Sequence, residues 1–368
     1  MRKWKDFLQR KDIVFSGKRY GIDAMAAMAQ GLFCTLLVGT ILNTIGQQFH
    51  IDFLTRILVT IKQGEQEIGY TLGGLASVMV GPGIAIAVGY ALHCPPLVLF
   101  SLIPVGFSAN AMGGAGGPLA VYAIAIISSE CGKLVSKETK IDILLTPIVT
   151  ILAGIGLSLL IAGPIGIAAS SLGNAVKWAT NQQPFLMGVL VSAIIGMALT
   201  LPISSAAICA ALSLTGLAGG AAVAGCCAQM VGFAVMSFRE NRWGGLVAQG
   251  IGTSMLQMPN IMKNPRIWIP PTLASMITGP LATCLFHLEM NGAPVSSGMG
   301  TCGFVGQIGI YTGWVNDVVS GAKAAITAMD WIGLALICFI LPAILSWIFC
   351  LILRKWGWIK EGDLKLDV

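Results

Sequence analysis

Charged residues are scarce in this sequence. Only 10% of its 368 residues are Asp, Glu, Lys or Arg, whereas roughly a quarter are charged in a typical soluble domain. Two tracts, residues 68–129 and 178–238, contain none of the four. Since a membrane span needs about 20 apolar residues, each tract can hold two or three spans. The sequence therefore argues against a soluble enzyme and predicts an all-α polytopic membrane protein.

Motifs of soluble catalysis and metal binding are also missing. The sequence has no Gly-x-x-x-x-Gly-Lys-Ser/Thr phosphate loop, no His-Glu-x-x-His and no Gly-x-Ser-x-Gly. Its 10 cysteines are scattered, and only Cys226 and Cys227 are adjacent, so neither a metal site nor a disulfide framework is indicated. The net charge of +6 comes from the ends and loops and not from a continuous basic face. We therefore expect no catalytic residue, metal, cofactor or nucleic-acid partner.

Both ends of the chain are predicted to be cytoplasmic. The first 20 residues carry seven Lys or Arg and lack the apolar run of a signal peptide. We expect residues 1–22 to form an amphipathic lead-in helix at the membrane surface, anchored by Trp4. Because basic residues also follow the last apolar run, residues 354–368 are predicted to form a cytoplasmic tail.

Glycine and proline are abundant, with 46 and 16 copies. In a membrane protein they mark broken helices, re-entrant hairpins and close helix contacts. Residues 23–353 read as one transmembrane domain of about ten spans, three of them in the second uncharged tract. Residues 50–67 are expected to form an amphipathic helix on the far surface and residues 243–262 a helix at the cytoplasmic face. Residues 289–307 are expected to re-enter the membrane.

Glu289 is the most isolated carboxylate of the sequence, between uncharged runs at residues 267–288 and 290–316. An ionisable residue inside a membrane segment is a functional hypothesis by default. A carboxylate accepts hydrogen bonds from two hydroxyl groups of a polyol such as a sugar, and short polar side chains add donors and acceptors. We therefore predict that Glu289 binds a hydroxyl-bearing solute at membrane depth. The alternative is an acid in contact with water at the end of a helix.

Six further polar side chains in or beside apolar stretches are candidates for the same site. For one of them, Gln229, the alternative is a bond between helices, which is the commoner role of a glutamine deep in an apolar run. For His93, which precedes Cys94-Pro95-Pro96, the alternative is a residue that ends a helix. The predicted substrate-binding residues besides Glu289 are Asn291, His287, Asn110, His93, Gln307 and Gln229.

A short pattern occurs twice in the sequence. Leu-Ala-Ser-x-x-x-Gly-Pro appears at residues 75–82 and again at 273–280, and each copy is followed by a histidine, a proline and Met-Gly-x-x-Gly. Many transporters are built from two related halves that share such features. We therefore predict half-repeats around residues 68–130 and 267–318. Chance is the alternative, because Gly, Ala, Ser and Pro are abundant.

Six strings carry a resemblance to a known family. Together they resemble the IIC membrane subunits of the bacterial phosphotransferase system, in the stand-alone branch that also includes proposed membrane regulators of toxin expression. The resemblance runs over nearly the whole chain. The strings are RYGIDAMAAMAQGLF (19–33), GKLVSKETKIDILLTP (132–147), LTLPISSAAI (199–208), CCAQMVGFAVMSFREN (226–241), GTSMLQMPNI (252–261) and NPRIWIPPTLAS (264–275).

The resemblance implies a homodimer in the bacterial plasma membrane, with about ten helices and re-entrant hairpins. It also implies a sugar that is carried inward and phosphorylated by a separate IIB protein at the cytoplasmic face, with IIA as the preceding carrier. No IIA or IIB domain is expected after Leu353. In glucose-type IIC subunits a Gly-Ile-Thr-Glu element supplies the sugar-binding carboxylate, and the nearest counterpart here, at residues 287–290, lacks Gly-Ile-Thr.

Three functions remain open from the sequence. The first is a sugar permease that is at most the membrane subunit of a sugar phosphotransferase. The second is a IIC-like membrane regulator or sensor without phosphotransfer-coupled transport, and the third is an ion channel, for which no ring-forming signature is found. The cytoplasmic charges expected to meet a IIB or regulatory partner are Lys133, Lys137, Lys140, Arg239 and Arg242.

Overall fold

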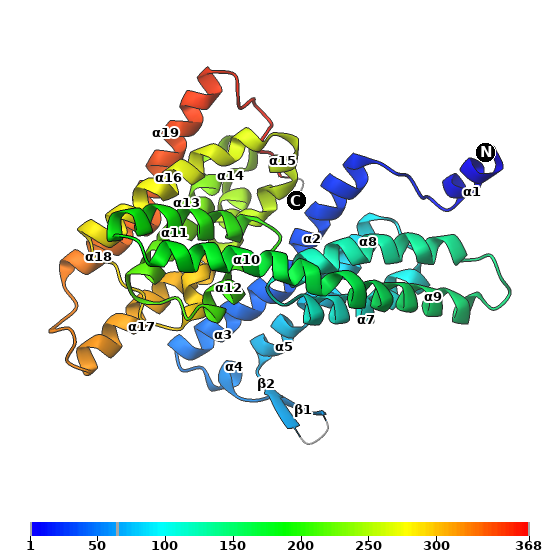
Figure 1. Cartoon of the computed structure of the whole chain (residues 1–368), viewed down its shortest axis with the longest axis horizontal. Helices are drawn as coiled ribbons and strands as arrows, with labels where there is room; N and C mark the ends of the chain where they lie inside the picture. The colour runs from blue at the N-terminus through cyan, green and yellow to red at the C-terminus, as the bar shows by residue number, and fades with distance from the viewer. Residues whose placement is uncertain (1, 64–65, 367–368) are drawn as a thin grey trace. The chain divides into compact units, whose positions relative to one another are not determined.

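The computed structural model describes residues 2–63 and 66–366 (Figure 1). Its contacts divide the chain into two compact units, Met1–Ala169 and Ser170–Val368. Apart from one two-stranded sheet, the regular elements of the described residues are helices. Each unit is described by itself below.

The first unit holds the sheet and about half of the helices. Short 3-10 and π segments, labelled η, continue or connect the α-helices. Its elements are α1 (Arg2–Arg10), η1 (Arg19–Asp23), α2 (Ala24–Leu32), η2 (Phe33–Leu37), α3 (Val38–Gln48), α4 (Asp52–Thr55), β1 (Val59–Gln63), β2 (Gln66–Tyr70), α5 (Leu72–Val78), α6 (Val80–Ala91), α7 (Pro96–Gly113), η3 (Gly114–Gly116), α8 (Gly117–Val135), α9 (Asp142–Leu157), η4 (Ser158–Ala162) and α10 (Gly163–Thr180), which continues past residue 169.

The second unit is helical throughout its regular elements. The segment between η8 and α17 is irregular apart from two short 3-10 turns, and a tail follows α19. The elements are α11 (Pro184–Thr200), α12 (Ser205–Ala211), α13 (Gly216–Met236), α14 (Phe238–Val247), η5 (Ala248–Gly252), η6 (Ser254–Gln257), α15 (Met258–Lys263), η7 (Pro265–Trp268), α16 (Ile269–Pro280), η8 (Leu281–Leu285), η9 (Pro294–Gly298), η10 (Cys302–Phe304), α17 (Val305–Val319), α18 (Ala328–Ala335), η11 (Leu336–Ile340) and α19 (Leu341–Lys355).

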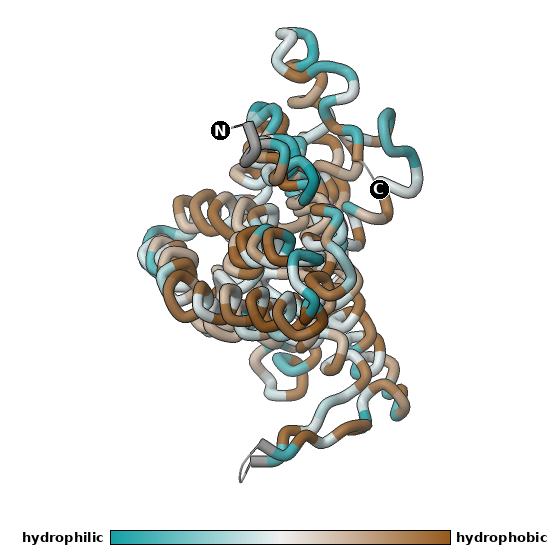
Figure 2. The backbone as a smooth tube through the Cα atoms, turned by 90° about the vertical axis from the view of Figure 1, so that its right-hand side faces the viewer, coloured by the Kyte–Doolittle hydropathy of each residue, from teal (hydrophilic) through white to brown (hydrophobic). Residues whose placement is uncertain are grey.

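Long apolar helices confirm the predicted all-α membrane-type fold. Among the described residues five continuous helices are long and apolar enough to cross a bilayer, or six if α5 and α6, which meet at 51°, form one broken span. Figure 2 shows that hydrophobic residues run along most of these helices and that hydrophilic residues lie mainly in loops and end segments. Ten spans are not confirmed. In the second uncharged tract α12 has only seven residues, too few to cross, and α11 is also shorter than a full span.

The predicted amphipathic helix over residues 50–67 is wrong. Among the described residues of this range, only the four of α4 are helical, and β1 and β2 form an antiparallel pair with Val59 opposite Tyr70 and Ile61 opposite Ile68. The physical reason lies in Val59-Thr60-Ile61. All three residues are β-branched, and the apolar Val59 and Ile61 alternate with the polar Thr60, a pattern that favours a strand over a helix.

Ion pairs hold the N-terminal segment to the loop between α8 and α9 of the same unit. Arg10 and Lys11 both reach Glu138, with N···O distances of 2.6 and 2.5 Å. Lys133, expected from the sequence to be exposed, is buried: it donates to the carbonyl oxygens of Asp12 and Leu92 and pairs with a glutamate at 3.1 Å. The sequence-based expectation for Lys133 is therefore wrong. The side chain of Trp4 lies outside the described residues.

Small residues allow α13 to lie at the centre of the second unit. Most of this helix is buried, and it packs on α11, α16 and α19. A Cβ added at Gly225 would lie 1.9 Å from the carbonyl oxygen of Ser192 in α11, so only glycine permits this approach. Close contacts of this kind are typical of helix packing in membranes.

A set of amide side chains holds the C-terminal tail against the second unit. Asn241 donates to the carbonyl oxygen of Leu364 at 2.8 Å and accepts from the backbone N–H of Leu366 at 2.8 Å. Gln257 and Asn260 donate to the carbonyl oxygens of residues 364 and 365. Since the Leu364 side chain is fully buried, the predicted tail is a packed part of this unit up to the last described residue.

Candidate functional site

Residues 287–291 lie outside the helices, between η8 and η9, and Met290 forms an isolated antiparallel β-bridge with Gly216. Side chains of an extended chain alternate between two faces. Leu288 and Met290 are buried at 2% and 0% exposure. The side chains between and beside them, His287, Glu289 and Asn291, line one cavity of about 290 Å³. A period of two thus separates a core face from a polar face.

Two backbone hydrogen bonds fix this register. Gly216, the first residue of α13, donates to the carbonyl oxygen of Met290 and accepts from its N–H, both at 3.0 Å. A glycine is suited to this position because its φ is +64°, in the left-handed region. A slip of one residue would exchange the apolar and polar faces. The bridge therefore decides which side chains reach the cavity.

Glycines on the neighbouring helices let the segment lie close to them. A Cβ added at Gly220 of α13 would lie 1.7 Å from the carbonyl oxygen of Leu288. A Cβ added at Gly313 of α17 would lie 2.8 Å from the backbone nitrogen of Asn291. Real Cβ atoms do not make such contacts, so a larger residue at either position would displace the segment.

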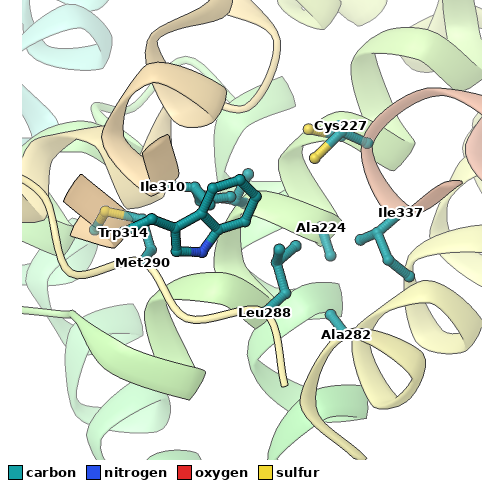
Figure 3. Close-up of a cluster of buried hydrophobic side chains, with 10 residues drawn as sticks. Ala224, Cys227, Ala282, Leu288, Met290, Ile310, Trp314 and Ile337 are labelled. Atoms are coloured by element: carbon teal, nitrogen blue, oxygen red, sulfur yellow. The ribbon is translucent and has the colours of Figure 1, made fainter. Parts of the chain in front are cut away.

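The apolar face of the segment joins a buried cluster (Figure 3). Leu288 and Met290 pack with side chains of α13, η8, α17 and η11. The indole of Trp314 lies beside Met290 and Ile310 in the figure and is 3% exposed. Trp314 also lines the cavity. The same ring thus belongs to the core and to the wall of the site.

Asn291 joins two carboxylates across the cavity. Its Nδ2 donates to Glu289 Oε2 at 3.1 Å and to Asp317 Oδ2 at 3.0 Å. Both donors of the amide nitrogen are thereby used. Nothing among the described residues donates to the other oxygen of either carboxylate or bonds to the imidazole of His287. These atoms are free to bind a ligand.

One cation also lines the cavity. Lys323 lies 5.2 Å from the ring centroid of Trp314 and pairs with Asp330 at 2.6 Å. Because Asp330 neutralises it, the charge surplus of the lining is negative. Ala322, an exposed residue, lines the cavity as well. The cavity therefore reaches the surface of this unit.

Two predicted residues of the second unit lie outside this cavity. Gln229 of α13 is fully buried and bonds to Thr200, Thr272 and Trp268 on other elements. That pattern matches the alternative of a bond between helices. Gln307 of α17 donates to Cys227 Sγ at 3.2 Å. Its Oε1 is buried without a hydrogen-bond partner in the described structure.

The other two predicted residues belong to the first unit. Asn110 in α7 packs between Gly81 of α6 and Gly117 of α8. His93 has a φ of +56° and follows α6. The N–H groups of His93 and Cys94 bond to the carbonyl oxygens of Tyr90 and Gly89, which is the Schellman pattern of a helix end. His93 also lines a cavity of about 400 Å³ with residues of the N-terminal segment and of the loop after α8.

Sequence reasoning missed Trp314, Asp317 and Lys323. Asp317 ends the uncharged run that begins after Glu289. A signal was present, because Trp314 and Asp317 are three residues apart and share a helix face with Gly313. Recognising it would have required knowing that α17 packs against residues 288–296.

Comparison with known proteins gives one finding. A family model described as "Phosphotransferase system, EIIC" matches residues 22–366 of the chain. No curated protein and no solved structure gives a significant match. The matched range includes every residue of the cavity.

Proposed function

The chain belongs to the EIIC family of the phosphotransferase system and is a multi-pass membrane component of that system; from this premise we propose that it carries a sugar or sugar-like polyol. In this proposal the solute binds in the cavity lined by His287, Glu289 and Asn291. The observation that carries the proposal is the alternation of residues 287–291, which presents three polar side chains to one cavity.

The cavity has the chemistry that a polyol requires. Glu289 and Asp317 each keep one oxygen to accept from a hydroxyl, and His287 offers a nitrogen donor or acceptor. Trp314 supplies an aromatic wall for a sugar ring. The volume of about 290 Å³ is near the lower end of small-molecule pockets, which span roughly 300–1,000 Å³. It suits a monosaccharide-sized ligand.

Asn291 contributes by aligning the two carboxylates before the ligand arrives. Because it donates to both, their free oxygens are held in place, and less conformational entropy is lost on binding. We assign Gln229 to helix packing and leave Gln307, Asn110 and His93 outside the proposed site. Glu289 remains its first hydroxyl acceptor.

The remaining assignments follow family membership and the charge distribution. We propose a homodimer in the bacterial plasma membrane, with both termini cytoplasmic and a separate IIB protein as the phosphate donor. In the same proposal, residues 289–307 form a re-entrant segment that places the solute site at membrane depth. No feature of the described residues favours a regulator without transport over a permease.

A ligand screen tests the proposal. Purified protein is heated with a panel of sugars and polyols, and a true ligand at 100 times its Kd is expected to add about 2.7 kcal/mol of stability. Glu289→Gln should remove the shift, whereas Glu67→Gln, in the exposed hairpin, should retain it. A panel without any hit favours the regulator. A hit that persists in Glu289→Gln refutes this cavity as the site.

A further inference from the structure

A groove of about 470 Å³ lies where α13, α14 and α19 come together in the second unit. Its walls are largely apolar and include Val235 of α13, Leu246 of α14 and Leu351 of α19. Neither the sugar cavity nor the tail contact uses any of these residues. The groove is a separate feature of the molecule.

Charges place the groove at the end of two membrane spans. The apolar helix α13 ends at Met236, three residues before Arg239, and α19 has Arg354 in its last turn. Arg354 pairs with Glu240 at 2.6 Å, which joins the end of α19 to the start of α14. Both spans therefore end at the same level, where hydrocarbon gives way to lipid headgroups.

Aromatic side chains support this position. Trp243 and Trp347 line the groove and are 72% and 51% exposed. Tryptophan is enriched at the boundary between membrane and water, because its ring is amphipathic. Two exposed indoles beside an apolar groove indicate contact with lipid rather than with bulk water.

The groove carries one cation that the protein leaves unpaired. Arg239 is exposed and has no ion-pair partner among the described residues, whereas Arg354 is already neutralised by Glu240. The surplus charge at the groove is therefore positive. A free anion would gain nothing from the apolar walls, but a lipid with an anionic headgroup matches both features.

We infer that this groove binds one anionic phospholipid, with its phosphate on Arg239 and an acyl chain along Val235, Leu246 and Leu351. The inference depends on the membrane placement of α13 and α19 and is independent of the sugar site. It assigns Arg239 to a lipid and not to the protein partner expected from the sequence. Basic pockets between membrane helices are known to bind such headgroups.

Native mass spectrometry of the detergent-purified full chain tests this inference. Phosphatidylglycerol and phosphatidylcholine with the same acyl chains are added in turn, and retained lipid is counted per protein. We expect phosphatidylglycerol to be retained preferentially. Arg239→Gln should weaken its retention about fivefold, the change that one basic contact at an anionic surface predicts.

Two further variants control for charge and for the groove itself. Arg242→Gln removes the same charge from an exposed position that does not line the groove. It should retain the lipid as the wild type does. Leu351→Trp fills the groove and should reduce retention of both lipids.

Several outcomes would overturn the inference. One is equal retention of the two lipids, and another is unchanged retention in Arg239→Gln. Competition by inorganic phosphate alone would point to a free anion. A change in the dimer fraction without a change in bound lipid would make the groove an interface between two copies of the chain.

Discussion

The segments that follow His93 and His287 begin alike and then diverge. Both histidines come after a helix and have positive φ, +56° and +45°. Both follow a glycine at which a Cβ would clash with a neighbouring helix, 2.2 Å from Gly106 O for Gly81 and 2.1 Å from Gly188 O for Gly279. After His93 the helix α7 starts at Pro96, whereas after His287 no α-helix starts before Val305.

The difference shows how a site is made from a similar start. In the helix α7 the backbone hydrogen bonds are made within the helix, so its side chains contribute mainly by packing. Residues 288–304 have little regular structure and depend on tertiary partners, such as the bridge to Gly216. Their polar side chains are free to face a cavity, because the backbone is held from the other side. The half-repeat itself stays a prediction.

Cations reinforce the contrast at the two helix ends. Arg19 and Lys133 both donate to the carbonyl oxygen of Leu92, at 2.6 and 3.1 Å, just before His93. Such contacts satisfy the last carbonyl groups of a helix. No cation of the described chain donates to the carbonyl groups at the end of η8. The end of α6 therefore has basic side chains bonded to its last carbonyl groups, whereas the end of η8, beside the cavity, has none among the described residues.

The largest effect is expected from Gly220→Ala. The new Cβ would meet Leu288 O at 1.7 Å, and overpacking in a core costs about 1–3 kcal/mol or more. We expect a lower Tm in detergent and loss of the ligand-induced shift. Gly81→Ala should also lower Tm but leave ligand affinity intact, since Gly81 lies in α6 of the first unit. Gly244→Ala, with open space around it, is the control.

A smaller effect is expected from Asn291→Ala. Removing the amide leaves two carboxylates without their shared donor, and a hydrogen bond to a charged group contributes about 1.5–3 kcal/mol. Ligand affinity measured by calorimetry should fall by roughly tenfold or more. Asn110→Ala in the first unit should leave it unchanged. An equal loss of ligand affinity in both variants would contradict the account that only the segment after His287 contributes to the site.

Glycine substitutions distinguish the role of His93 from the role of His287. A residue other than glycine in the left-handed region costs roughly 1 kcal/mol, so His93→Gly should raise the unfolding free energy by about that amount without changing ligand binding. His287→Gly relieves the same strain but removes an imidazole from the cavity. Its ligand affinity should therefore fall. Unchanged affinity would show that His287 only ends a helix.

The smallest effect is expected from lowering the pH, which should weaken the ion pairs of the N-terminal segment. A hydrogen bond from Arg19 lowers the pKa of Asp12, and one from Lys11 lowers the pKa of Glu138. Their contribution to stability is complete above the ordinary values of 3.8 and 4.5 and is lost as the pH falls through the lowered ones. A spin label at position 15 should become more mobile below about pH 4. Constant mobility down to pH 2 would contradict the ion-pair account.

The sequence was sufficient for the all-α membrane-type fold and for three of the residues that line the candidate cavity. Long uncharged tracts predicted membrane helices, and the isolation of Glu289 led to His287 and Asn291, which are its neighbours in sequence. Asp317 and Trp314 could not be assigned in this way, because they reach the cavity through the packing of α17 on residues 288–296. The hairpin of residues 59–70 was missed because charged residues obscured a period of two.

Binding of a screening hit to Asp317→Asn, measured by isothermal titration calorimetry beside Glu289→Gln, tests the central claim most directly. Asp317 comes from α17 and shares the Asn291 amide with Glu289. If the two carboxylates hold one solute, both variants lose affinity by roughly tenfold or more. Wild-type affinity in both variants would show that the solute binds elsewhere.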